Sequence, residues 1–451
     1  MDNRRATLEL ETKPVGRLLM QYALPAIIAM TASSLYNMVD SIFIGQGVGA
    51  LAISGLAVTF PFMNLSAAFG AAIGVGASTL ISVKLGQKDY RTAVHILGNT
   101  MTLNVVIGLV FCVVSMLFLD HILLFFGGSE QTIPYARDYM QVILLGNVVT
   151  HVYFGMNAAL RASGKPRKAM YATMCTVALN TLLDPLFIYG LGMGIRGAAW
   201  ATVLSQAVAM VWQLSVFCRQ DELVHLEQGT FAPRWTIVRN IVGIGCSPFA
   251  MNACACLVVV FINNGLMRHG GDMAVGAYGI ANRVAFIFVM VTMGINQGMQ
   301  PIAGYNYGAG HTDRLMRALF LSIMAATVVM TGGWVLAEFF THPCARLFTS
   351  DEELTQLTVR AMRILMLVLP VVGYQMVITN FFQSIGKASV SIFLSLSRQL
   401  IFLLPLLVLL PRIWGVDGVW YAMPASDLCS AVVTAVVMGL FMKRTRRQQH
   451  N

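Results

Sequence analysis

Charged side chains are scarce in this chain of 451 residues, because Asp, Glu, Lys and Arg make up 11% of it while hydrophobic residues make up 57%. Soluble domains carry roughly a quarter of their residues as charges, so the composition excludes a water-soluble globular protein. No GxxxxGK[ST] loop is present, which argues against ATP as an energy source within this chain. The eight cysteines form no CxxC pair and are expected to be small apolar residues of helix interiors.

The dominant feature is a series of long apolar runs. A hydrocarbon core about 30 Å thick needs roughly 20 apolar residues per helix, and strands of the alternating type found in membrane barrels are absent. The polar start and the length of the first run indicate no cleavable signal, so the first helix should be retained. The sequence predicts an all-α polytopic membrane protein with twelve transmembrane helices, at about 17–42, 50–82, 93–118, 135–160, 168–189, 195–218, 240–266, 274–303, 315–340, 354–382, 388–410 and 416–442.

The positions of the basic residues predict the topology. Of the 30 Lys and Arg, 21 lie in segments on the same side as the N-terminus, and four lie in loops on the other side. The positive-inside rule then places both termini in the cytoplasm. The net charge of +10 therefore indicates topology and attraction to anionic lipid, and it gives no reason to expect nucleic-acid binding.

The chain repeats itself at an offset of about 222 residues. Each half contains six predicted spans, so both halves enter the membrane in the same orientation, as expected of a transporter with a pathway between two bundles. We expect an N-terminal bundle at 1–218, a cytoplasmic linker at 219–239 that is a plain tether, and a C-terminal bundle at 240–451. The aligned segments are GASTLISVKLG (76–86) with GMQPIAGYNYG (298–308), NAALRASGK (157–165) with TNFFQSIGK (379–387), and GIRGAAWA (194–201) with GVDGVWYA (415–422).

A polar stripe marks the first predicted helix. Ser33, Asn37 and Asp40 follow one another at i, i+4 and i+7, with Tyr36 beside them, so they share one helical face that must contact protein or water. Ionisable groups within spans are costly and are candidates for function. The alternative is that Asp40 lies at the outer interface and reaches water.

A second polar group lies on the fifth and sixth helices. Asn180 and Asp184 share a helix face, and Pro185 directly after them removes a backbone amide, which predicts a kink and a free carbonyl. Thr202 lies at a similar depth. These oxygens could form a proton site or an oxygen cage for a cation such as Na⁺, and the alternative is a structural kink. Two carboxylic acids in one apolar pocket would favour proton binding.

The second half lacks equivalent acids. Asp40 aligns near Asn263, and the third acid well within a predicted span, Asp427, aligns with Gln206. A structural ion pair of Asp427 with Arg283 or Arg398 is favoured over a role in transport. This asymmetry predicts that coupling to an ion occurs in the N-terminal half.

These features resemble the multidrug and toxic compound extrusion (MATE) transporters over essentially the whole chain. The resemblance is carried by LPAIIAMTASSLYNMVDSIFIG around Pro25 and Asp40, by the loop motif NAALRASGK with Asn157 and Arg161, by Asn180 with Asp184 and Pro185, and by GMQPIAGYNYGAG and QSIGK in the second half. Because the acids lie in the first half, the chain is most similar to the DinF-like branch, which includes the MepA-type exporters.

The resemblance implies a V-shaped pair of six-helix bundles that exports organic cations and other drugs in exchange for H⁺ or Na⁺. Such a protein is no enzyme, has no cofactor, lies as a monomer in the bacterial plasma membrane and contributes to antibiotic resistance. A lipid-linked oligosaccharide flippase of the same superfamily is the alternative, and its cavity should contain several arginines. By analogy, the ion site, which could hold Na⁺, is formed by Asp40, Asn180, Asp184 and Thr202. The residues expected to line the substrate cavity of the same bundle are Ser33, Tyr36, Asn37, Tyr139 and Asn157. Pro25 and Pro185 are the expected hinges, and the first helix bends at Pro25.

Overall fold

Helices are the only regular secondary structure in the part of the chain that its computed structural model describes, which comprises residues 9–126, 128–219, 221–348 and 351–450. A few side chains within helices, including that of Asn37, lie outside this part. Ten of the described helices are long and apolar enough to cross a membrane, and two bent helix pairs bring the number to twelve. The prediction of an all-α protein with twelve spans is therefore confirmed.

The first bundle contains six spans and one short helix. They are α2 (Val15–Gly47), α3 (Ala50–Gly86), α4 (Tyr90–Leu117), the short α5 (Leu119–Phe125), the pair α6 (Ile133–Leu145) and α7 (Asn147–Ala162), α8 (Pro166–Pro185) with the π-helical turn η1 (Leu186–Gly190), and α9 (Ile195–Phe217).

The second bundle repeats this plan. Its first two spans form one element, α10 (Trp235–Gly308), which is interrupted at Gly271, where φ is +65°. They are followed by α11 (Thr312–Phe339), the short α12 (Thr341–Arg346), the pair α13 (Glu352–Leu365) and α14 (Leu369–Ser384), α15 (Ala388–Leu396) with η2 (Ser397–Leu403) and α16 (Leu404–Trp414), and α17 (Val416–His450).

Two of the twelve spans are bent, although their sequences predict single helices. The α6–α7 pair bends by 55° and the α13–α14 pair by 50°. In the first pair the break is at Gly146, which lies so close to Val203 of α9 that a side chain there would clash. In the second pair, a proline lies in the first turn of α14. The N–H that proline lacks would have no partner within the helix at this position, so the proline is tolerated there.

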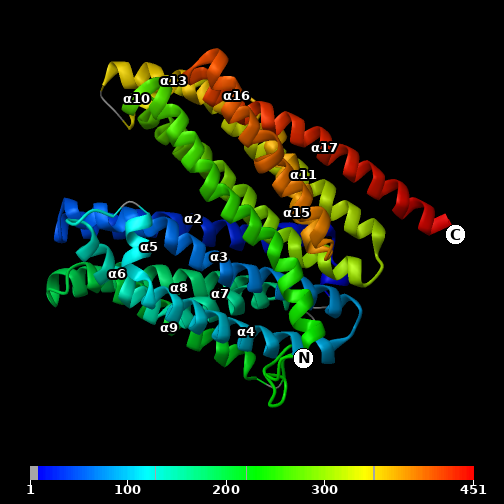
Figure 1. Cartoon of the computed structure of the whole chain (residues 1–451). Helices are drawn as coiled ribbons and strands as arrows, with labels where there is room; N and C mark the ends of the chain where they lie inside the picture. The colour runs from blue at the N-terminus through cyan, green and yellow to red at the C-terminus, as the bar shows by residue number, and fades with distance from the viewer. Residues whose placement is uncertain (1–8, 127, 220, 349–350, 451) are drawn as a thin grey trace.

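The two bundles form a V (Figure 1). At the end where α2 begins and α17 ends, which we call the closed end, one apolar core combines residues of both bundles, such as Tyr22, Ile241 and Phe381. At the other, open end each bundle has a core of its own, around Phe62 in the first and Trp420 in the second. The bundles are therefore joined by burial of apolar surface at the closed end and separate towards the open end.

Close backbone contacts at the closed end follow the sequence repeat. A Cβ atom at Gly86 of α3 would clash with the carbonyl oxygen of Tyr305 on α10, and one at Gly308 of α10 would clash with the carbonyl oxygen of Val83 on α3. The two contacts are related by the 222-residue offset, because Gly86 aligns with Gly308 and Val83 aligns with Tyr305. The structure thus places a pseudo-two-fold axis between α3 and the end of α10, where only glycine permits this approach.

A valine at Gly245 should destabilise the contact between the bundles. Gly245 of α10 lies against the backbone of Ala72 on α3, whereas Gly243, two residues earlier, has open space around it. Overpacking of this kind costs about 1–3 kcal/mol. We expect Gly245→Val to lower the midpoint of thermal unfolding in detergent by several degrees more than Gly243→Val, and equal effects of the two substitutions would contradict the assigned contact.

The linker between the bundles is docked on the first bundle. The Asn99 side chain of α4 donates to the Thr230 carbonyl at 3.0 Å and accepts from the Arg234 amide at 2.7 Å, and Glu222 forms an ion pair with Lys165. Since α10 begins at Trp235, the linker comprises residues 219–234. Its interpretation as a plain tether is wrong, because these backbone groups are satisfied by side chains of the first bundle.

Candidate functional site

Two acidic side chains meet inside the first bundle. Asp40 on α2 and Asp184 at the end of α8 are 6% and 0% exposed, and their carboxyl groups lie close enough to interact with each other. Neither forms an ion pair with any residue in the described ranges. Two negative charges in contact at a site of low dielectric repel each other strongly, so the pair is stable only when it holds a proton or another cation.

Polar side chains from three helices surround this pair. Asn180 Nδ2 donates to Thr202 Oγ1 at 3.2 Å and lies 3.5 Å from Asp184 Oδ1. Tyr139 of α6 lies close to Thr202 and to both acids. We call the five residues Asp40, Tyr139, Asn180, Asp184 and Thr202 the acidic cluster. The structure therefore brings together all four residues predicted to bind the coupling ion.

The acidic cluster has acceptor atoms without donors. Asp40 Oδ1, Asn180 Oδ1 and Asp184 Oδ2 are buried and receive no hydrogen bond from the described residues. A buried acceptor of this kind is costly unless something fills its lone pairs. Carboxylate, amide and hydroxyl oxygens are also the ligands that hard cations prefer. The donor set fits either a proton shared between the acids or a dehydrated Na⁺.

The two prolines predicted as hinges lie within helical segments. Pro25 lies inside α2, which the structure gives as one continuous helix. Pro185 is the last residue of α8, and the span continues as a π-helical turn instead of ending in a sharp kink. A π turn is a common way to accommodate a missing backbone hydrogen bond at a functional site.

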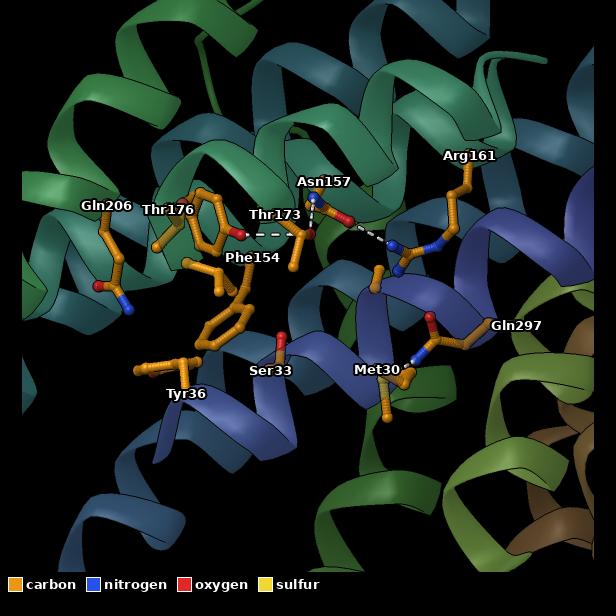
Figure 2. A pocket seen from close by; sticks show the side chains of 13 residues that line it. Met30, Ser33, Tyr36, Phe154, Asn157, Arg161, Thr173, Thr176, Gln206 and Gln297 are labelled. Carbon is orange, nitrogen blue, oxygen red and sulfur yellow. Dashed lines mark hydrogen bonds between the residues drawn. The ribbon is translucent and has the colours of Figure 1, made fainter. Parts of the chain in front are cut away.

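A cavity of about 240 Å³ lies beside the acidic cluster, between α2, α7, α8 and α9 (Figure 2). Its lining is mostly neutral and polar. Gln297 of α10 closes it from the other bundle, and its Nε2 lies 3.3 Å from Met30 Sδ of α2. The lining residues are Ala29, Met30, Ser33, Tyr36, Tyr153, Phe154, Asn157, Arg161, Thr173, Thr176, Val177, Gln206 and Gln297.

The predicted cavity residues divide between the cavity and the acidic cluster. Ser33, Tyr36 and Asn157 line the cavity, whereas Tyr139 belongs to the acidic cluster and Asn37 has its side chain outside the described part. Tyr36 connects the two features, because it lines the cavity and also lies close to both acids. A ligand in the cavity is thus one side chain away from the carboxyl pair.

Arg161 lines the cavity although it falls just beyond the span predicted at 135–160. It lies in the last turn of α7 and donates to Asn157 Oδ1, one turn earlier. Asn157 is itself fixed by its hydrogen bond to the Ala169 carbonyl of α8, at 3.0 Å. The i, i+4 spacing of these polar residues could have indicated a shared face towards the bundle interior.

The second bundle contains an ion pair whose acid aligns with Gln206 of the cavity lining and not with a residue of the acidic cluster. Arg398 Nε of η2 donates to Asp427 Oδ1 of α17 at 2.6 Å, while Arg283 is exposed. The prediction that Asp427 forms an ion pair is confirmed, with Arg398 as its partner. Because this acid already has a cation beside it, it has less tendency to take up another.

Comparison with known proteins identifies the family. A model of the MatE family matches the chain twice, over residues 25–186 and 248–409. The chain belongs to the MatE family. The two matches are displaced by 223 residues, close to the offset of the repeat. MatE proteins are transporters rather than enzymes and need no cofactor, so this chain is a multi-pass membrane transporter.

Individual relatives of this MatE protein are multidrug exporters. It is 26% identical over 431 residues to the multidrug export protein MepA of Staphylococcus haemolyticus, covering 95% of both chains. It is also 26% identical over 432 residues to MepA of Staphylococcus aureus strain NCTC 8325, covering 95% of this chain and 94% of that protein.

Solved structures share the fold of this MatE protein. A MATE transporter in a bent conformation matches with a TM-score of 0.93 at 23% identity, over 99% of both chains. A multidrug resistance MATE transporter in an outward-facing conformation matches with a TM-score of 0.91 at 23% identity, over 97% of this chain and 98% of that one. The prediction of two parallel six-helix bundles in a V is therefore confirmed.

Proposed function

We propose that this protein exports drug-sized cationic or amphipathic molecules from the bacterial cytoplasm in exchange for H⁺ or Na⁺. The proposal is supported above all by the contact between the buried Asp40 and Asp184 carboxyls, which no cationic side chain of the described residues neutralises. An ion must enter this site for the charges to be balanced, and an ion that must bind can drive transport. The staphylococcal MepA relatives are named multidrug export proteins, which supports drugs as the cargo.

Exchange follows from competition for one pair of negative charges. A coupling ion at the acidic cluster neutralises Asp40 and Asp184, so a cationic substrate in the neighbouring cavity loses its attraction to them. When the ion leaves, the acids again attract the cationic end of a substrate through the side of the cavity formed by Tyr36. Ion and substrate therefore occupy the first bundle alternately.

The V shape gives this exchange a direction. With both termini in the cytoplasm, as the basic residues predict, the closed end is cytoplasmic and the open end faces outward. We propose that ion binding bends α2 at Pro25, where the missing amide weakens the helix, and that this contracts the cavity and releases substrate outward. The functional halves are 1–218 and 235–451, connected by the linker at 219–234, and the protein acts as a monomer surrounded by lipid.

Flipping of a lipid-linked oligosaccharide is not favoured by the cavity. A pyrophosphate group would require several cationic side chains, and the lining contains a single arginine and no lysine or histidine. The acidic cluster beside it would repel a pyrophosphate.

Ethidium transport into proteoliposomes would identify the coupling ion. We expect uptake to be driven by an imposed proton gradient or an imposed sodium gradient, whichever ion the acidic cluster binds, and to stop when an ionophore collapses that gradient. Liposomes that contain Asp40→Asn protein are the matched control. Uptake that needs neither gradient, or that is undiminished in Asp40→Asn, would overturn the proposal of antiport.

A further inference from the structure

The short segment before α2 docks on the second bundle. We call residues 9–13 the N-terminal arm. Leu10, which is 1% exposed, belongs to the apolar core that combines both bundles at the closed end. The Tyr305 hydroxyl of α10 donates to the Glu11 carboxylate at 3.4 Å. The arm therefore connects the helix that begins the first bundle to the second bundle.

Arg314 of α11 holds the backbone of this arm. Its Nη2 donates to the carbonyl oxygen of Leu10 at 3.0 Å and to that of Lys13 at 2.7 Å. In a continuous helix the Leu10 carbonyl would accept from the N–H of the fourth residue after it, but that residue is Pro14, which has none. The guanidinium supplies the missing donor, and a cation at the C-terminal end of a helical turn is also favoured electrostatically.

Arg314 is itself held in position. Its Nε donates to Asn306 Oδ1 at 3.2 Å, and Asn306 Nδ2 donates to the Ile302 carbonyl one turn earlier in α10 at 2.8 Å. Asn306 is fully buried. Arg314 forms no ion pair with an acid of the described ranges. No carboxylate there competes with the arm for the guanidinium.

The linker repeats this arrangement in the opposite sense. It leads into α10, the first helix of the second bundle, and it docks on α4 of the first bundle through Asn99. The helices that hold the two segments are equivalent in the repeat, because α4 begins at Tyr90 and α11 begins at Thr312. The closed end is therefore fastened by two reciprocal segments, each of which leads into one bundle and is held by the other.

We propose that Arg314 keeps the closed end shut by holding the N-terminal arm, and that the arm leaves Arg314 before the bundles separate there. The proposal rests on the proposed export function, because export requires the closed end to open and admit substrate from the cytoplasm. Arg314 acts through the arm and touches neither the cavity nor the acidic cluster. It is a positioning residue for the change of access.

Alkylation of an introduced thiol measures opening of the closed end. Ser82 of α3 is 1% exposed, and a Cβ atom at Gly304 of α10 would lie 2.8 Å from its Cβ. The thiol of Ser82→Cys protein should therefore react with N-ethylmaleimide only when the bundles part, and mass spectrometry of the labelled peptides distinguishes it from the native cysteines. Adding Arg314→Gln should raise its alkylation rate about tenfold or more, as expected when a charge-assisted hydrogen bond of the closed state is lost.

The chain offers matched controls for this experiment. Arg317 lies on the same helix and is exposed, so Arg317→Gln should change the rate less than about twofold. The native thiol of Cys254 in α10 is buried and reports general loosening, so its alkylation rate should stay unchanged in every variant. Leu10→Ala removes the apolar anchor of the arm and should also accelerate alkylation of the introduced thiol. Combining it with Arg314→Gln should add little, because both substitutions release the same segment.

Four results would overturn the proposal. The first is an unchanged rate in Arg314→Gln, and the second is an equal acceleration at Cys254, which would mean that Arg314 only stabilises the fold. The third is full additivity of Leu10→Ala and Arg314→Gln, which would exclude the arm as the partner. The fourth is an unchanged rate in Leu10→Ala, which decides the question even if Arg314→Gln fails to fold. Labelling is done on purified protein without an ion gradient or a drug, so failure of ion-coupled transport would leave this test unaffected.

Discussion

Asparagine in place of Asp40 should abolish the drug resistance that the protein confers on a host lacking its own pumps. Asparagine preserves the shape of the side chain but cannot carry the charge that binds the ion, so Asp184 remains as a lone acid beside a neutral amide. Ethidium efflux from cells should fall at least tenfold, to the level of cells without the protein, while the amount of protein in the membrane stays unchanged. Asp184→Asn should have the same effect, because the two carboxyls act as a pair.

Asp120→Asn is the matched control for this loss. Asp120 lies on α5 in the same bundle, and it is exposed and paired with Arg137 by a hydrogen bond of 2.8 Å. Exposed pairs of this kind contribute little to stability, and Asp120 is outside the acidic cluster, so efflux should stay at the wild-type rate. Wild-type efflux in the Asp40 variant would refute the site, as would an equal loss in all three variants.

Glutamine in place of Glu222 should cause the largest loss of stability. Glu222 is 5% exposed and forms an ion pair with Lys165, in the turn between α7 and α8, whose side chain is 9% exposed. Removing one partner of a buried pair leaves the other charge uncompensated and costs about 3–5 kcal/mol. We expect a lower thermal midpoint for unfolding in detergent and faster protease cleavage in the linker (219–234).

Two controls and the dependence on pH sharpen this prediction. Glu227→Gln, at an exposed position of the linker, should have no effect, and the double variant Lys165→Met with Glu222→Met should recover much of the loss.

Burial lowers the pKa of Lys165, and contact with Glu222 opposes this shift. In Glu222→Gln the pKa of Lys165 is therefore lower in the folded protein than in the unfolded chain. Above neutral pH the unfolded chain binds more protons than the folded protein, so the free energy of unfolding increases with pH. The deficit of Glu222→Gln should therefore be smaller at about pH 9 than at neutral pH, and a larger deficit would contradict this account.

The number of spans and the repeat are predictable from sequence because lipid constrains composition over the whole length of each helix. Helix bends and the docking of loops depend on contacts between segments that are distant in sequence. The hydropathy of a segment carries no information about those contacts. The bend at Gly146 depends on its approach to Val203 of a different helix, and the linker is docked because Asn99 can reach its backbone. Neither partner is close in sequence to the residue that it positions.

The candidate site was predictable where its residues share one helix and not where they meet across helices. Helical spacing groups Asn180 with Asp184, but their contact with Asp40 depends on the packing of α8 against α2. Arg161 escaped prediction because a basic residue near a helix end is usually a topology signal. The structure places it in the cavity, since the last turn of α7 lies inside the bundle.

Ion release on substrate binding tests the exchange at the acidic cluster most directly. Purified protein in a weakly buffered, sodium-free solution would be mixed with ethidium while a pH-sensitive dye reports free protons, and the same experiment with bound radioactive sodium would report Na⁺. We predict that ethidium displaces one of these ions from wild-type protein and displaces neither from Asp40→Asn. Ethidium binding that releases neither ion from wild-type protein, or that releases as much from Asp40→Asn, would contradict a shared site for ion and substrate.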